Sequence, residues 1–267
     1  FSLANSVALS TSCRSLVFIG DPQQLSQPVL GSHPIGAASS VLEHLVGDQD
    51  VVDEDFGLFL PKTYRMHPDL TEVVSAISYD SRLSSMGNLE RLELVDNPPL
   101  PKSGLVYIPV EHRGNTYRSM QEVAVAKKVA EFLLRRSWID KNGDRLRVTS
   151  EQIMVVAPYN AQANVLSVAL EGLAVVGTVD RFQGREAPFV IVSLSASDGD
   201  SSSRGVDFLF SINRLNVAIS RAKVMSVIIA SPALIETKPN TIEQLRLLGA
   251  VTKVVKSAAR VEASQFA

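Results

Sequence analysis

The sequence predicts an α/β fold in which a parallel sheet carries helices on both faces. Continuous apolar runs of strand length, at 153–157, 189–195 and 224–230, alternate with amphipathic helical segments. Apolar residues make up 45% of the chain and charged residues 20%, as in an ordinary globular protein. The length of 267 residues allows one to two domains with a buried core.

The first part of the chain predicts short elements and a domain boundary. Residues 2–12 are typical of a helix, 15–19 of a buried strand that ends in a turn, and 41–46 of a helix. Five carboxylates fall within residues 48–55, which indicates a solvated connector. We therefore expect two units, 1–56 and 57–267.

In the second unit, strands alternate with helices. Pro68 suits the first turn of a helix, where its missing N–H costs nothing, and Ser119 and Glu122 have capping-box spacing. Asn160 is the expected N-cap of a later helix. The expected strands are 58–60, 104–110 (inside the loop-rich stretch 84–118), 153–157, 175–179, 189–195 and 224–230. The expected helices are 68–78, 119–136, 160–170, 213–222 and 241–248.

Composition narrows the class of protein. The net charge of −2 lacks the basic footprint of a protein that coats nucleic acid, so any such contact must be a local groove. The single cysteine, Cys13, rules out an internal disulfide and fits a reducing compartment. No apolar run reaches the roughly 18 residues of a membrane span, and no secretory signal is visible. We expect a cytoplasmic protein without a membrane partner.

Two polar blocks carry candidate phosphate chemistry. The first, GDPQQL at 20–25, follows the expected strand, and a glutamine there can orient an attacking water in phosphoryl transfer. The second, TYRMHP at 63–68, places Arg65 on a loop from which it could neutralise transition-state charge. Taken alone, the first is at least as typical of a polar turn, and a lone arginine such as that in the second is far more often a surface residue.

Two further blocks follow in the second half of the chain. TVDRFQGRE at 178–186 groups polar side chains beside Gly184, a residue free to adopt unusual backbone angles. NRLNVAISRAK at 213–223 places Arg221 near the end of a helix, before a buried strand. The simpler interpretations are a charged loop and basic residues that complement a helix C-terminus. The chain has no GxxxxGK[ST] phosphate loop and no GxGxxG fingerprint.

In this order, the four blocks resemble the third to sixth motifs of superfamily 1 helicases. The resemblance is to the branch that contains the nonsense-mediated-decay RNA helicase and the replication-associated nuclease–helicases. FLFSINRLNVAISRAK, followed by SPALIE and TIEQLRLLGA, is similar to bacterial members that often carry a RecB-like nuclease upstream. The resemblance spans residues 3–248 and implies a RecA-like second motor domain, preceded by the C-terminal remnant of a first RecA-like domain in residues 1–56.

The resemblance also implies roles for individual residues. Gln24 would sense the γ-phosphate and the attacking water, while Arg65 and Arg221 would be arginine fingers. Gly20, Asp21, Gln183, Gly184 and Glu186 would complete the nucleotide site. Thr178 would contact the nucleic-acid backbone, and Tyr159 in APYNAQ would line the same edge. No residue of this chain is expected to ligate a metal.

The implied ligands are ATP and Mg²⁺, both held mainly by a first motor domain upstream of Phe1. The implied partners are that domain, an upstream nuclease domain of the kind that bacterial members often carry, and single-stranded nucleic acid, with DNA favoured over RNA and movement 5′ to 3′. The fragment alone would not hydrolyse ATP. Two alternatives stay open: a RecA-like module that binds nucleic acid or a partner without catalysis, and, less well supported, an unrelated Rossmann-type enzyme.

Overall fold

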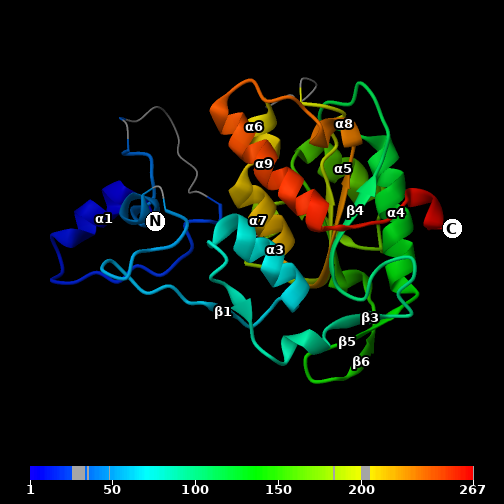
Figure 1. The fold of residues 1–267 in the computed structure, drawn as a ribbon, viewed down its shortest axis with the longest axis horizontal. Coiled ribbons are helices and arrows are strands. Elements are labelled where there is room, and N and C mark those ends of the chain that lie inside the picture. Colours follow the sequence, from blue (N-terminus) through cyan, green and yellow to red (C-terminus); the bar gives the residue numbers. More distant parts are fainter. Residues whose placement is uncertain (26–33, 35, 48, 183, 200–204, 267) are drawn as a thin grey trace.

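A six-stranded sheet forms the centre of the molecule (Figure 1). The computed structural model describes residues 1–267 except 26–33, 35, 48, 183, 200–204 and 267. The strand order is β11-β4-β10-β9-β7-β8, and every neighbouring pair is parallel. The strands are β4 (Gly104–Pro109), β7 (Ile153–Ala157), β8 (Val175–Thr178), β9 (Ala187–Ser193), β10 (Ala222–Ala230) and β11 (Ala259–Arg260). The predicted α/β fold with a parallel sheet is confirmed.

Helices cover both faces of this sheet. Along β4, Leu105 and Tyr107 pack into one core, and Val106 and Ile108 pack into the other, because successive side chains of a strand point to opposite faces. The first core includes residues of α3 (Pro68–Ser78), α6 (Gly205–Leu209), α7 (Ile212–Ser220), α8 (Pro232–Ile235) and α9 (Ile242–Ser257). The second core includes residues of α4 (Met120–Leu134) and α5 (Asn160–Ala169). Burial on both faces explains why the central strands are apolar throughout.

The N-terminal segment lies beside this body and adds no strand to its sheet (Figure 1). It contains α1 (Leu3–Ser10) and α2 (Val41–Val46), close to the expected helices. The expected strand at 15–19 is wrong: Val17 is 85% exposed and Ile19 is 92% exposed. An apolar run forms a strand only where a neighbour supplies ladder hydrogen bonds, and no described strand lies beside this one.

Several short strands were mispredicted or missed. The expected strand at 58–60 is wrong, since Leu58 and Leu60 are exposed, and the chain pairs two residues later. There β1 (Lys62–Thr63) lies parallel to β2 (Ser84–Ser85). A second small sheet is antiparallel and combines β3 (Glu93–Val95), β5 (Ser137–Ile139) and β6 (Arg145–Arg147). Strands of two or three residues carry too little periodicity to be predicted.

Helix boundaries differ from the expected ones at three points. Tyr159, not Asn160, is the N-cap of α5, and its side chain makes no capping bond. The side chain of Ser119 caps α4, but Glu122 does not return the bond of a capping box. The last long helix continues to Ser257, nine residues past the expected end at Leu248. Short 3-10 helices occur at Leu89–Arg91, Ser150–Gln152, Asp180–Phe182 and Ala263–Gln265. None of the helices described is long and apolar enough to cross a bilayer.

Candidate functional site

A tight turn at residues 20–24 forms one side of the candidate site. Asp21 organises it: its Oδ1 accepts from the N–H of Gln23 at 3.0 Å, and its Oδ2 accepts from Nε2 of Gln24 at 2.8 Å. A Cβ on Gly20 would lie 2.7 Å from Cδ1 of Leu42, so a side chain there would force Leu42 to move. The backbone N–H of Gln23 and the side-chain amide of Gln24 are therefore both fixed by Asp21.

Arg221 meets this turn from the other part of the chain. It is the C-cap of α7, and its Nη2 donates to Oε1 of Gln24 at 3.2 Å. The residue is only 3% exposed, and its Nε has no hydrogen-bond partner among the described residues. Burial lowers the pKa of the Arg221 guanidinium, and the nearby charge of Arg65 lowers it further. Arginine remains charged despite such a shift, so the site holds a buried cation with an unused donor.

Arg65 lies between β1 and α3 and reaches the same region. Its Nε donates to Oε2 of Glu186 at 2.6 Å, and its Nη1 donates to the carbonyl oxygen of Ser220 at 3.2 Å. The hydroxyl of Thr63 accepts the N–H of Arg65 at 3.2 Å, which fixes the loop before α3. Arg65 and Arg221 thus belong to one cluster with Asp21, Gln24 and Glu186, which we call the arginine cluster.

Glu186 is the carboxylate that partly balances these cations. Its Oε1 lies 2.7 Å from Nζ of Lys223. The hydrogen bond from Lys223, and then that from Arg65, lowers the pKa of Glu186. Its side chain is 40% exposed, so solvent weakens both ion pairs. Gly184 has a φ of +80°, a conformation that favours glycine, and Gln183 lies outside the described residues.

The structure adds side chains that the sequence did not single out. The Tyr79 hydroxyl donates to Oδ2 of Asp21 at 2.5 Å and accepts from Nδ2 of Asn216 at 3.1 Å. Nδ2 of Asn216 also donates to the carbonyl oxygen of Gln23 at 2.8 Å, and Nδ2 of Asn213 donates to that of Gln24 at 2.7 Å. Burial and the Asp21 charge raise the pKa of Tyr79, so it stays a donor. Both asparagines belong to the fourth sequence block, whereas no pattern marks Tyr79.

Thr178 and Tyr159 lie together, but at the opposite edge of the sheet from Glu186 and Arg221. Thr178 ends β8 and pairs with Ala157 at the end of β7, two residues before Tyr159. Glu186 and Arg221 immediately precede β9 and β10, which start side by side. Tyr159 is buried, and its ring centroid lies 5.4 Å from that of Phe208.

The arginine cluster is suited to binding an anion. Two guanidinium groups lie close enough for one to lower the pKa of the other, and Lys223 adds a third cation. Like charges held together favour a bound group of opposite charge, and planar guanidiniums match phosphate oxygens. In the part of the chain that the structure describes, no group of three or more His, Cys, Asp or Glu side chains could hold a metal ion.

Comparisons with known proteins identify the family of this chain. A family model described as an AAA domain matches residues 37–233. Regulator of nonsense transcripts 1 homolog of Neurospora crassa is 28% identical over 247 residues, covering 85% of this chain and 21% of that protein. Putative helicase mov-10-B.1 of Danio rerio is 25% identical over 260 residues, covering 86% and 26%. ATP-dependent helicase upf1 of Schizosaccharomyces pombe is 28% identical over 245 residues, covering 85% and 25%.

The chain therefore spans about a quarter or less of the length of these relatives. The family match covers the arginine cluster from Arg65 onward, and the segment at 20–25 precedes it. The matched region includes β4 to β10, and with them both faces of the sheet. The chain belongs to the AAA domain family and to the superfamily 1 helicases of the nonsense-mediated-decay branch.

Proposed function

We propose that this chain supplies the second motor domain of an ATP-dependent helicase that moves along single-stranded nucleic acid. In this proposal residues 57–267 are the motor domain, and residues 1–56 are the end of the first. Neither unit alone hydrolyses ATP, because the phosphate loop that cradles the nucleotide is expected in the first domain. ATP is the substrate at the junction of the two units.

One contact carries the proposal: the hydrogen bond from Nη2 of Arg221 to Oε1 of Gln24. These residues are 197 positions apart in the sequence, and they come from the two different units. A water-orienting glutamine and an arginine finger must reach the same phosphate group, so the mechanism needs these two side chains close together. The buried, unpaired Nε of Arg221 supports it further, since a phosphate oxygen is a suitable acceptor.

Each member of the arginine cluster has a part in the proposed reaction. Arg221 and Arg65 stabilise the negative charge that develops on the transferred phosphoryl group. Gln24 orients the attacking water with its amide, and Asp21 keeps that amide in place. Glu186, with Gln183 and Gly184 nearby in sequence and Gly20 in the turn at 20–24, binds the rest of the nucleotide. Because Glu186 holds Arg65 at 2.6 Å here, the arginine must exchange this partner for phosphate during the reaction.

The proposed nucleic-acid contact is Thr178, and the buried Tyr159 lines the same edge. They share the carboxyl edge of β7 and β8, away from the arginine cluster. We propose 5′-to-3′ movement and DNA as the strand. RNA is the second arm of any test, since relatives are named as regulators of nonsense transcripts. Mg²⁺ is assigned to the first motor domain.

The test is ATP hydrolysis by the protein at full length, with its first motor domain, for wild type and Arg221→Ala. Hydrolysis is measured without nucleic acid, with single-stranded DNA and with single-stranded RNA. We expect stimulation by a single strand, and a loss of about 10³-fold or more in the variant, the usual contribution of an arginine finger. Arg246→Ala is the matched control, because that arginine is 75% exposed on α9.

Equal hydrolysis by wild type and Arg221→Ala would contradict the finger assignment. No hydrolysis by the wild type would contradict the motor and leave the non-catalytic binding module, which strand affinity then measures. Stimulation by RNA alone would replace DNA as the proposed strand while leaving the motor intact.

A further inference from the structure

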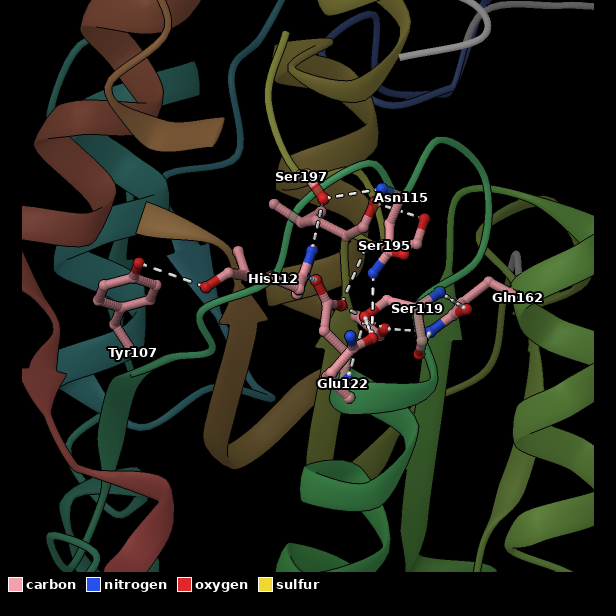
Figure 2. A network of polar contacts seen from close by, with 12 residues as sticks. Tyr107, His112, Asn115, Ser119, Glu122, Gln162, Ser195 and Ser197 are labelled. Carbon is pink, nitrogen blue, oxygen red and sulfur yellow. Dashed lines mark hydrogen bonds and ion pairs between the residues drawn. The ribbon is translucent and has the colours of Figure 1, made fainter. Parts of the chain in front are cut away.

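A buried carboxylate lies under the carboxyl edge of the sheet, far from the arginine cluster. Glu122 lies in the first turn of α4, within a network of polar contacts (Figure 2). Its side chain is completely buried. Its Oε1 lies 2.9 Å from Nε2 of His112, and its Oε2 accepts from the hydroxyl of Ser193 at 2.6 Å and the N–H of Ser195 at 2.9 Å. One acid therefore joins α4, the segment after β4 and the end of β9.

The imidazole of His112 extends this network to the loop of residues 111–118. Its Nδ1 lies 2.8 Å from the hydroxyl of Ser197, which also accepts the N–H of Asn115 at 2.9 Å. The N–H of Ser197 donates to the carbonyl oxygen of Asn115 at 2.9 Å. Because a carboxylate can only accept, the ring donates from Nε2 to Glu122. Both ends of the loop are fixed, since Ser119 donates its N–H to the buried Gln162 of α5.

The backbone beside the network is strained. Ser195 has a φ of +65°, which a non-glycine residue adopts only where its surroundings hold it. Here the Glu122 carboxylate binds its N–H. A buried charge is also costly compared with an apolar group of the same size. A strained backbone and a buried acid at one point indicate that the network maintains the position of the neighbouring loop, and does not serve stability alone.

A serine, a histidine and an acid joined by hydrogen bonds also occur in the active sites of hydrolases, but this arrangement cannot bind a substrate. Ser197 is 1% exposed, and the side chains of His112 and Glu122 are completely buried. No reacting group can reach the hydroxyl. The network therefore acts through the surface that it supports.

That surface carries two arginines, one glutamate (Glu111) and an aromatic ring. Arg113 and Arg118 are exposed, and Tyr117 is 50% exposed. Within the part of the chain that the structure describes, neither arginine has an ion pair. The loop runs from the carboxyl end of β4 to α4, whose start is bonded to the first turn of α5. It therefore lies at the sheet edge that carries Tyr159.

We propose that Glu122 is a positioning residue that holds the loop 111–118 as a contact surface for one nucleic-acid strand. Arg113 and Arg118 bind the phosphates of that strand, and Tyr117 stacks on a base. This inference rests on the proposed function, since it extends the strand contacts beyond Thr178. The proposed arginine contacts recognise the backbone of the nucleic acid and not its base sequence, because arginine–phosphate contacts do not distinguish one base from another.

The experiment is binding of a fluorescent oligothymidylate to the full-length protein across a series of salt concentrations. Arg113→Ala/Arg118→Ala tests the contacts directly, and Glu122→Gln tests the positioning. Each phosphate contact to a single strand contributes about 0.7 to the slope of log affinity against log salt, so losing two should reduce it by about 1.4. Arg147→Ala, an exposed arginine of β6, is the matched control and should leave the slope unchanged.

The slope separates positioning from simple unfolding, because a partly unfolded sample loses active protein but keeps the slope of the remainder. We expect Glu122→Gln to reduce both affinity and slope. Unchanged binding by the double arginine variant would show that the loop 111–118 is not a contact surface. A reduced affinity at unchanged slope in Glu122→Gln would contradict the positioning role of Glu122. If the wild type bound no strand, the proposed function would fail with it, whereas normal wild-type binding with unaffected variants would reject this inference alone.

Discussion

Arg65 and Glu186 are 121 residues apart in the sequence, yet Nε of one donates to Oε2 of the other over 2.6 Å. The same carboxylate binds Lys223 through its second oxygen. Glu186 therefore keeps two cations of the arginine cluster occupied. Four predictions follow from this cluster and from the packing around it.

The acid dependence of folding should reflect Glu186. A carboxyl whose pKa is lower in the folded state stabilises the fold above its unfolded pKa, about 4.3 for glutamate, and loses this contribution as the pH falls through the folded value. Glu186→Gln should therefore be less stable than wild type at neutral pH, by less than about 1 kcal/mol because the pair is exposed. Urea unfolding at a series of pH values measures the gap, which should close below about pH 4. A gap that widened in acid would reverse the assigned shift.

Tyr79→Phe should loosen the turn at 20–24 without disturbing the sheet. It removes one of the two donors to Oδ2 of the half-buried Asp21, at a cost of about 1.5 kcal/mol for a hydrogen bond to a charged group. Hydrogen exchange should rise at Gln23 and Gln24, whose N–H groups bond to Asp21, and stay unchanged in β9 and β10. Tyr107→Phe is the control, since its hydroxyl makes only a 3.4 Å bond to the carbonyl oxygen of Ala230. Equal exchange in the two variants would show that Tyr79 does not hold the turn.

Leu70→Ala should destabilise the protein by about 2 to 5 kcal/mol, the usual cost of a core leucine with its cavity. The side chain is fully buried on α3 and packs in the same core as α7 and α9. Thermal and urea unfolding would measure the loss. Glu72→Ala, on the exposed side of the same helix, should change stability by no more than about 0.5 kcal/mol. A small effect of Leu70→Ala would place α3 outside the core.

Gly177→Ala should be harmful although its φ is ordinary. A Cβ there would lie 2.9 Å from Cδ of Arg181 and 3.1 Å from two ring carbons of Phe182. The arginine can move, but Phe182 is 1% exposed and must displace its neighbours, at a cost of about 1 to 3 kcal/mol. Gly87→Ala is the control, because nothing lies within 4 Å of the added carbon. Unfolding midpoints of the two variants should differ, and matching midpoints would contradict this close contact.

The sequence predicts the central sheet well because its strands are buried on both sides. Runs such as Ile153–Ala157 are apolar at every position, and the helix at Pro68–Ser78 begins at a proline and matches its expected bounds. The same rule failed at residues 15–19, whose apolar run has no pairing strand in the described structure. Apolar composition indicates that a segment can be buried, whereas pairing depends on a neighbour from another part of the chain.

The sequence predicts which residues form the candidate site better than it predicts how they are arranged. The blocks contain Gln24, Arg65, Glu186 and Arg221, and the structure brings these four together. Their roles in catalysis stay predictions. Tyr79 could not be found, because a single tyrosine at a helix end resembles any core residue until its partner Asp21 is placed 58 positions away. Glu122 was predicted as a capping residue, since local spacing cannot reveal a partner on a distant strand.

β9 starts at the residue after Glu186 and ends at Ser193, whose hydroxyl bonds to Glu122. All seven of its residues are buried, and it is paired on both sides by β10 and β7. A strand of this length spans about 23 Å and has no hinge along it. In the two proposals, the nucleotide site lies at one end of β9 and the nucleic-acid contact surface at the other. β9 would then move as one rigid body, so that a shift caused when Arg65 exchanges its partner also displaces the nucleic-acid contact surface at the loop 111–118.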